Sequence, residues 1–180
     1  SVFLDSPLAI RVTEIYKRLT GKDVFDFPML HETGEVRDSI AIAEAKTPKI
    51  ILAGSGMSTA GRILFHEERY LPDPNTTILF VGYQTPGTLG RQIREGMKDV
   101  TINGTRVRVN ARVESIDGFS AHAGSDQLVD FVSHSKDTLK KVFVTMGEPK
   151  ASIFLAQRLK DELEVDSIIP KIGERYELDL

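Results

Sequence analysis

Short apolar runs alternate along the chain with longer stretches in which apolar residues recur every three or four positions. The runs predict strands at 2–4, 49–53, 77–81, 141–145 and 165–169, and we expect those at 49–53 and 77–81 to be buried. The longer stretches predict helices at 7–20, 35–46, 63–70, 89–97, 125–133 and 149–163. Strands that alternate with helices are typical of the α/β class with a mostly parallel sheet.

One pair of strands is expected to be antiparallel. Residues 100–102 and 105–109 both read as strands, and Asn103-Gly104 between them is the strongest hairpin signal that a short sequence offers. We expect the chain to divide into two lobes near this hairpin.

The composition is that of a globular protein and excludes several classes of protein. Of the 180 residues, 41% are hydrophobic and 27% are charged, which is ordinary for a globular protein. There is no cysteine, so disulfides and thiolate zinc sites are excluded. No apolar run approaches the roughly 18 residues that a membrane span needs. The sequence shows no signal-peptide pattern, and we expect a cytoplasmic protein without membrane contact.

Charge is unevenly spread along the chain. The net charge is −3, which excludes a globally basic nucleic-acid binder, but residues 86–112 carry a net +4 and residues 161–180 a net −5. The basic segment could face a polyanion, or it could be a solvated helix and hairpin.

A loop of small residues, 54–61, lies between a predicted strand and a predicted helix. Exposed backbone N–H groups there suit an anion. The loop lacks the glycine spacing of a dinucleotide fingerprint and the Gly-Lys-Ser/Thr of a P-loop. A tight turn that needs glycine explains it equally well.

The same loop imitates a nucleophile elbow. Ser58 lies in Gly-Met-Ser-Thr-Ala, and Asp117 and His122 follow in the order of an α/β-hydrolase triad. Ser58 is equally consistent with a helix N-cap.

The four histidines form no pair with the spacing of metal ligands, so a complete metal site within the chain is not expected. His122 is the best functional candidate, because its small-residue loop before a helix would let an imidazole meet a phosphate or donate a proton. A capping or surface role is the simpler alternative.

A series of motifs resembles the β-CASP ribonucleases, the RNA-processing branch of the metallo-β-lactamase fold. The motifs occur in order along nearly the whole chain: Val2–Ala9, Ala53–Met57, Gly61–Leu64, Leu71–Asn75, Phe80–Gln84, Gly87–Arg91, Asp117–Ala123 and Gly173–Arg175.

The resemblance implies only the C-terminal part of such an enzyme. Residues 1–109 would be the β-CASP lobe, and residues 110–180 the returning segment of the metallo-β-lactamase domain. The family's H-x-H-x-D-H zinc motif is absent from this chain. Zinc is therefore the cofactor of the intact enzyme, we expect none to be held by this chain alone, and the N-terminal metallo-β-lactamase half is an expected partner.

The resemblance also assigns roles to individual residues. His122 matches the family histidine beside the scissile phosphate and is the expected catalytic residue. The expected phosphate-binding residues are Gly54, Ser55, Gly56, Met57, Ser120 and Arg91. Met146 occupies the position of a family zinc-binding histidine, and a thioether is a poor zinc ligand.

Three functions follow from these features. The first is the RNA-contacting part of a metal-dependent ribonuclease that hydrolyses phosphodiester bonds, inactive as an isolated chain. The second is a non-catalytic RNA-binding or assembly module, and the third is a serine hydrolase with Ser58 as nucleophile. Association into a homo-oligomer stays open.

Overall fold

A computed structural model describes residues 1–22, 26–119 and 121–178. The chain forms two compact units, Ser1–Ser120 and Ala121–Leu180. The division between family lobes that we expect at residue 109 stays a prediction.

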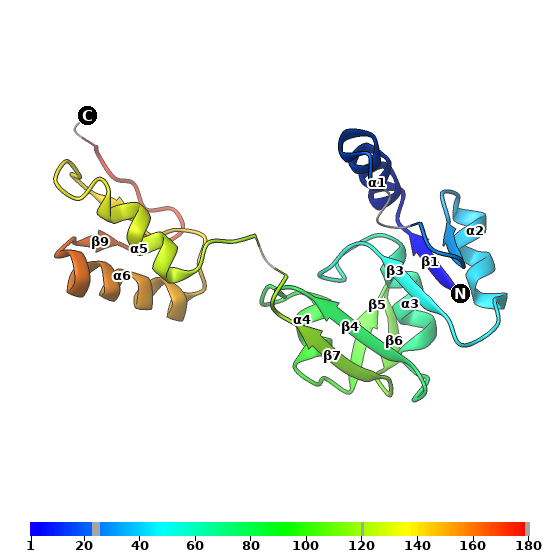
Figure 1. Ribbon diagram of the computed structural model, residues 1–180. Helices are drawn as coiled ribbons and strands as arrows, with labels where there is room; N and C mark the ends of the chain where they lie inside the picture. Colours follow the sequence, from blue (N-terminus) through cyan, green and yellow to red (C-terminus); the bar gives the residue numbers. More distant parts are fainter. Residues whose placement is uncertain (23–25, 120, 179–180) are drawn as a thin grey trace. The chain divides into compact units, whose positions relative to one another are not determined.

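The first unit begins with a three-stranded parallel sheet. Strand β1 (Val2–Asp5) lies between β2 (Leu30–Glu32) and β3 (Ile50–Ala53), as Figure 1 shows. The predicted helix after β1 is α1 (Pro7–Thr20), where Ser6 accepts a hydrogen bond from the N–H of Ala9 and Gly21 ends the helix in the left-handed conformation. Helix α2 (Val36–Ala41) and the 3₁₀ helix η1 (Ile42–Glu44) precede β3.

A second group of elements completes this unit. It contains α3 (Arg62–Tyr70), β4 (Thr77–Val81), α4 (Leu89–Arg94), β5 (Asp99–Ile102), β6 (Thr105–Arg108) and β7 (Arg112–Ile116). Strands β4 and β7 pair in parallel, whereas β5 and β6 form the predicted antiparallel hairpin. Asn103 and Gly104 have φ angles of +49° and +83°, as a tight hairpin turn with two left-handed residues requires.

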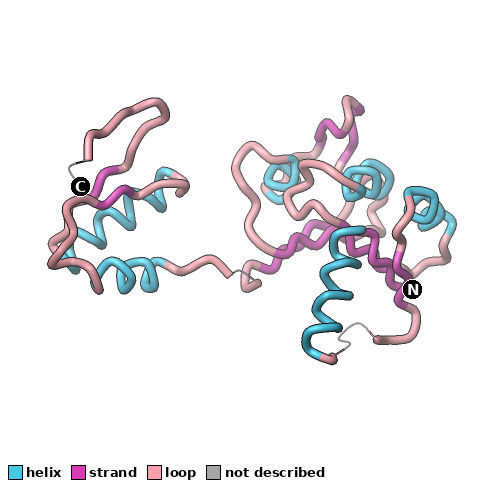
Figure 2. Tube along the Cα trace, turned by 90° about the horizontal axis from the view of Figure 1, so that it is seen from above, coloured by secondary structure: helices cyan, strands magenta, loops and turns pink. Residues whose placement is uncertain are grey.

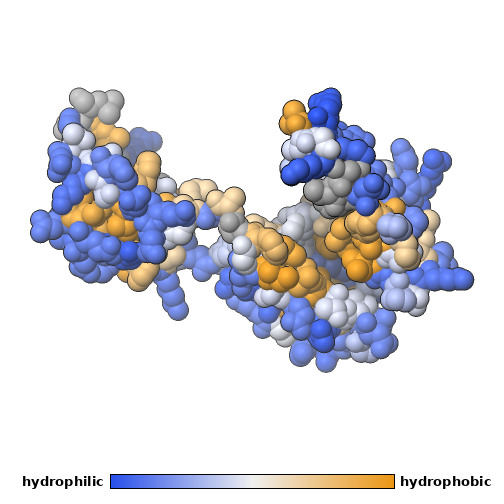
Figure 3. All heavy atoms as spheres, in the orientation of Figure 1, coloured by the Kyte–Doolittle hydropathy of each residue, from blue (hydrophilic) through white to orange (hydrophobic). Residues whose placement is uncertain are grey.

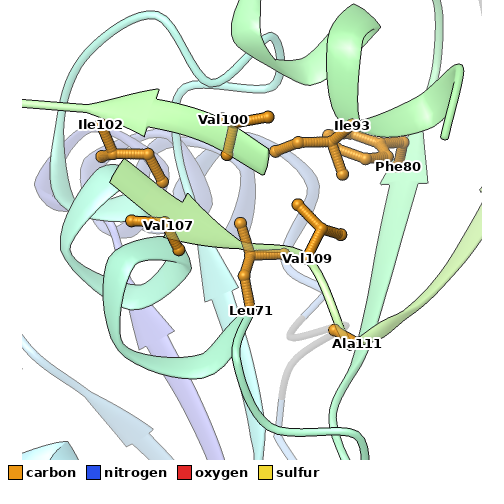
Figure 4. Packing of buried hydrophobic residues seen from close by; sticks show 8 residues of the cluster. All are labelled: Leu71, Phe80, Ile93, Val100, Ile102, Val107, Val109 and Ala111. Carbon is orange, nitrogen blue, oxygen red and sulfur yellow. The ribbon is translucent and has the colours of Figure 1, made fainter. Parts of the chain in front are cut away.

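The apolar core of this unit lies where these elements meet. Figure 4 shows its eight buried side chains, which come from the end of α3, from β4 and α4, and from the hairpin and the segment after it: Leu71, Phe80, Ile93, Val100, Ile102, Val107, Val109 and Ala111. Their burial from water is the main favourable contribution to folding of this part of the chain.

The second unit is smaller. It contains α5 (Ser125–Ser133), β8 (Val142–Phe143), α6 (Pro149–Leu163) and β9 (Ser167–Ile168), with β8 and β9 paired in parallel. Its core is formed by Val129, Val144 and Leu159. Figure 2 shows that helices and loops account for most of this unit.

The predicted α/β class with mostly parallel pairing is confirmed, and several details of the prediction are wrong. The helix predicted at 35–46 is α2 followed by η1, and the strands predicted at 141–145 and 165–169 are the two-residue β8 and β9. Strands β2 and β7 were not expected. Strands β3 and β4 are not buried, since Ile50, Leu52, Leu79 and Val81 are 58%, 41%, 49% and 55% exposed. Helix α4 ends at Arg94 and not at Met97, because Gly96 takes a φ of +88° that no helix continues.

Apolar side chains reach the surface of both units, as Figure 3 shows for one face. Among the helices in the described ranges, none has both the length and the apolar character to cross a bilayer.

Candidate functional site

The small-residue loop between β3 and α3 is built around a tight turn. The N–H of Ser58 donates to the carbonyl oxygen of Ser55 at 3.0 Å, which places Gly56 and Met57 at the two central positions of a β-turn. The hydroxyl groups of Ser55 and Thr59 lie 3.1 Å apart across its exposed side.

The carbonyl groups of this turn are held by the segment that leads into α4. The side-chain amide of Gln84 donates to the carbonyl oxygen of Gly56 at 2.8 Å, and the N–H of Gly90 donates to that of Met57 at 3.1 Å. These two bonds hold the carbonyl oxygens of the central residues, whereas the carbonyl oxygen of Ser55 is held by the N–H of Ser58. Among the hydrogen bonds of the described residues, none uses the N–H of Gly56 or Met57. The turn therefore offers two backbone donors for an external acceptor.

At Gly90, helix α4 comes close to Gln84 and to the carbonyl group of Met57 in the turn. An added Cβ would lie 2.1 Å from Oε1 of Gln84 and 3.0 Å from the carbonyl oxygen of Met57. Only glycine lets α4 approach the turn this closely.

Arg91 follows at the next position of α4. Its guanidinium donates to the carbonyl oxygen of Gln84 at 3.1 Å and to Oε1 of Glu95 at 2.6 Å, and its side chain is 28% exposed. The structure thus brings Arg91 to the segment that holds the turn.

The other arginines of the basic segment 86–112 are also paired with carboxylates. Arg94 contacts Asp117, Arg106 and Arg108 contact Asp99, and Arg112 contacts Glu114. These pairs offset much of the positive charge that the sequence suggests.

A buried carboxylate anchors the end of the loop that leads into α3. Asp5, at the end of β1, is fully buried and accepts hydrogen bonds from Thr33, Ser39, Arg62 and His66. Burial by itself raises the pKa of Asp5, but the hydrogen bonds from Ser39, His66, Thr33 and Arg62 hold that pKa below its usual value. The charged carboxylate thereby ties β1 to the first turns of α3, which begins where the loop ends.

Ser58 has a different environment from the one expected of a nucleophile or a helix cap. Its side chain is 2% exposed and its hydroxyl donates to Oε1 of Glu67 at 2.5 Å. A nucleophile elbow presents its serine at an exposed turn, and Asp117 is bound to Arg94 at 2.7 Å. The N-cap of α3 is Gly61. Both interpretations of Ser58 are therefore wrong.

His122 belongs to the second unit. It is exposed, in the segment before α5, where Gly124 is the N-cap and its N–H donates to Oε1 of Gln127 at 2.9 Å. Ser120, another expected phosphate contact, lies outside the described residues. The roles of His122 and Ser120 stay predictions.

Comparison with known proteins identifies the family. Residues 1–93 match the Beta-Casp domain. The chain belongs to the Beta-Casp family. Residues 106–170 match a second family, the Zn-dependent metallo-hydrolase RNA specificity domain.

The relatives of this Beta-Casp chain include a ribonuclease and a transcription factor. Ribonuclease TTHA0252 of Thermus thermophilus is 36% identical over 88% of the chain and 39% of its own length. Transcription termination factor FttA of Pyrococcus horikoshii is 30% identical over 87% of the chain and 25% of its own length, and FttA of Methanosarcina mazei is 33% identical over 70% and 21%. The chain thus spans well under half of each of these proteins.

The zinc that the second family name implies can be tested against the residues of the Beta-Casp chain. Within residues 1–22, 26–119 and 121–178, no group of three or more His, Cys, Asp or Glu side chains could hold a metal ion. Met146 is fully exposed, and its thioether is a poor ligand for zinc. The described residues do not by themselves fit a zinc site.

Several residues that build the site were given no role from the sequence. Gln84, Gly90 and Glu67 bind loop residues that lie 28, 33 and 9 positions away in the chain, namely Gly56, Met57 and Ser58. One signal was available, because a glycine inside a predicted helix often marks a close approach.

Proposed function

We propose that this chain forms the RNA-contacting part of a metal-dependent ribonuclease that hydrolyses phosphodiester bonds. The observation that carries this proposal is the turn at 55–58, whose carbonyl oxygens are engaged by Gln84 and Gly90 while the N–H groups of Gly56 and Met57 stay available. Two fixed N–H donors suit a phosphate oxygen and carry no information about base sequence.

The other assigned residues add charge and proton transfer. Arg91 contributes a guanidinium beside the turn, where it strengthens phosphate binding electrostatically. His122 orients the scissile phosphate or protonates the leaving oxygen. Zinc would be held by residues beyond those of this chain, so the chain's own contribution is binding, orientation and a proton.

A pair of substitutions at one position tests the role of the turn. In Gly56→Pro, the ring removes the N–H while proline remains compatible with the second position of a β-turn. Gly56→Ala keeps the N–H, and an added Cβ meets nothing within 4 Å. We expect Gly56→Pro to weaken binding of a fluorescent single-stranded RNA by about tenfold, the scale of one hydrogen bond to a charged group. Gly56→Ala should bind like the unchanged chain. Equal affinities of the two variants would contradict the proposal.

A second candidate is RNA binding without cleavage. It is favoured by Met146, which stands where the family resemblance expects a zinc-binding histidine. Incubation of the RNA with the longest natural form of the protein and added zinc separates the two functions. Cleavage supports the ribonuclease, whereas bound and intact RNA supports the non-catalytic module.

A further inference from the structure

The buried pair Ser58–Glu67 joins the candidate RNA-binding loop to the middle of α3. The two side chains are 2% and 3% exposed, and the hydroxyl of Ser58 lies 2.5 Å from Oε1 of Glu67, nine positions further along the chain. The loop is thus held by the buried side chain of a residue in α3.

Ser58 is also the residue that closes the turn. Its N–H makes the 3.0 Å bond to Ser55 that defines the turn, and its φ is +54°, a left-handed conformation that residues other than glycine seldom adopt. Such a conformation persists when its surroundings hold it. The hydrogen bond to Glu67 is the side-chain contact that does so.

Burial of the carboxyl group of Glu67 costs folding free energy. In the described part of the chain its second oxygen, Oε2, has no hydrogen-bond partner. Burial raises the pKa of Glu67 to about 7, although the bond from Ser58 lowers it. An apolar residue would pack at this position without such a penalty, so stability alone does not explain a carboxyl group there.

The two candidate phosphate donors lie between the residues that this pair controls. Gly56 and Met57 are the central residues of the turn that the Ser58 N–H closes, so loss of the conformation of Ser58 would release this closing bond and with it the direction of the two N–H groups. Directed hydrogen bonds weaken steeply when the donor angle changes. The effect of Glu67 on RNA would therefore pass through Ser58 and not through contact with the ligand.

We propose that Glu67 is a positioning residue that, through its buried hydrogen bond to Ser58, sets the direction of the Gly56 and Met57 N–H groups toward a phosphate of bound RNA. The proposal rests on the proposed function. It adds to that function a residue that neither touches the RNA nor belongs to the loop.

The experiment compares five variants by RNA affinity, thermal stability and amide hydrogen exchange; one of them is the double variant that combines Glu67→Ala with Ser58→Ala. Glu67→Ala and Ser58→Ala each remove the hydrogen bond, and Glu67→Gln keeps an acceptor for the Ser58 hydroxyl. Val107→Ala is the matched control, because it removes buried side-chain volume from the core cluster of the same unit, and that cluster includes none of residues 55–58. The probe is a fluorescent single-stranded RNA of mixed sequence.

We expect Glu67→Ala and Ser58→Ala to weaken RNA binding by about tenfold, the scale of one lost buried hydrogen bond. The double variant should be no weaker than either single variant, because both remove the same bond. Hydrogen exchange of the Ser58 N–H should be faster in Glu67→Ala and in Ser58→Ala. In Glu67→Gln, the RNA affinity and the exchange rate of this N–H should match those of the unchanged chain. Val107→Ala should lower stability and leave affinity unchanged.

Two outcomes separate the failure of this proposal from the failure of the proposed function. If the unchanged chain binds RNA and Glu67→Ala binds equally well, or loses no more affinity than Val107→Ala, the positioning role of Glu67 is wrong and the RNA-binding function stands. If the unchanged chain does not bind RNA at all, the proposed function itself is wrong. Should Glu67→Ala fail to fold, Ser58→Ala and Glu67→Gln carry the same comparison.

Discussion

The guanidinium of Arg62 donates to the fully buried carboxylate of Asp5 at 2.5 Å, although the two residues lie 57 positions apart in the chain. The same guanidinium donates to the carbonyl oxygens of Thr33 and Gly34. A single cation therefore joins the end of β1, the segment after β2 and the first turn of α3.

This arrangement makes Arg62→Ala a severe substitution. Removal of Arg62 leaves the charge of Asp5 buried with one partner fewer, so we expect the free energy of unfolding to fall by about 3 kcal/mol, as for other broken buried ion pairs. Urea denaturation at pH 7 measures the change. The control is Arg37→Ala, which removes an 85% exposed arginine whose contact with Asp38 spans 3.7 Å and should change stability by less than about 0.5 kcal/mol.

Glu67 should make stability fall as pH rises. Its pKa is raised from 4.5 to about 7 in the folded chain, so between these values the folded state binds more protons than the unfolded state. The contribution of Glu67 is therefore most favourable below pH 4.5, is lost as pH rises toward 7, and is constant above that. Glu67→Gln has no such titration. We expect its stability relative to the unchanged chain to increase by about 2 to 3 kcal/mol from pH 5 to pH 8, from the shift of roughly 2.5 units. Denaturation curves of both proteins at pH 5 and pH 8 measure this change. The same difference in free energy of unfolding at the two pH values would contradict the prediction.

Gly90→Ala tests the close contact between α4 and the turn. Alanine normally stabilises a helix by up to about 1 kcal/mol over glycine. Here the added Cβ would meet Gln84 and the carbonyl oxygen of Met57. We expect a loss of about 1 to 3 kcal/mol from overpacking, together with weaker RNA binding. Gly34→Ala is the control, because its Cβ would meet nothing within 4 Å. Stabilisation by Gly90→Ala would show that Gln84 and the turn can move away from the added Cβ without a loss of stability.

His122 should matter for rate and not for folding. Because its side chain is exposed, we expect His122→Ala to change stability little. In a complete, zinc-loaded enzyme that contains this chain, the cleavage rate should fall on the order of 10²-fold, the usual scale for a positioned acid or base, with RNA affinity nearly unchanged. Cleavage rate and melting temperature are measured on the same variant. A lower melting temperature with a normal rate per folded molecule would instead indicate a capping role.

RNA binding should be sensitive to salt and tolerant of base sequence. Phosphate contacts release counterions, so affinity should fall between 50 and 200 mM salt. The decrease should be modest, because all five arginines of segment 86–112 are paired with carboxylates. Arg91→Ala should reduce the salt slope, and Arg37→Ala should leave it unchanged. Fluorescence titrations at several salt concentrations, with two unrelated RNA sequences, measure both properties.

Local signals in the sequence predicted the elements whose ends are set by local chemistry. Ser6 and Pro7 mark the start of α1, and Asn103-Gly104 marks the hairpin. Both signals act within a few residues, so one sequence is enough to interpret them. The motifs that resemble the family also led to the correct family.

Long-range pairing could not be predicted in the same way. Strand β7 contains Arg112, Glu114 and Ser115 and has no apolar pattern of its own, yet it pairs with β4 through backbone groups that every sequence possesses. The bond from Gln84 to the turn and the contact of Gly90 also depend on how distant segments meet. The sequence located the loop, whereas only the fold shows which of its donors are unused.

The pairing of β7 with β4 has a consequence for where this protein can be divided. Strand β7 lies outside the Beta-Casp match at 1–93 and inside the second match at 106–170, but it completes the sheet that β4 begins. Val107, Val109 and Ala111 from the same stretch fill the core around Phe80. A polypeptide cut between the two matched regions would expose the edge of β4 and an open apolar core, and both attract other chains and promote aggregation. The border between the two sequence families is therefore not a border at which the polypeptide can be separated into soluble halves.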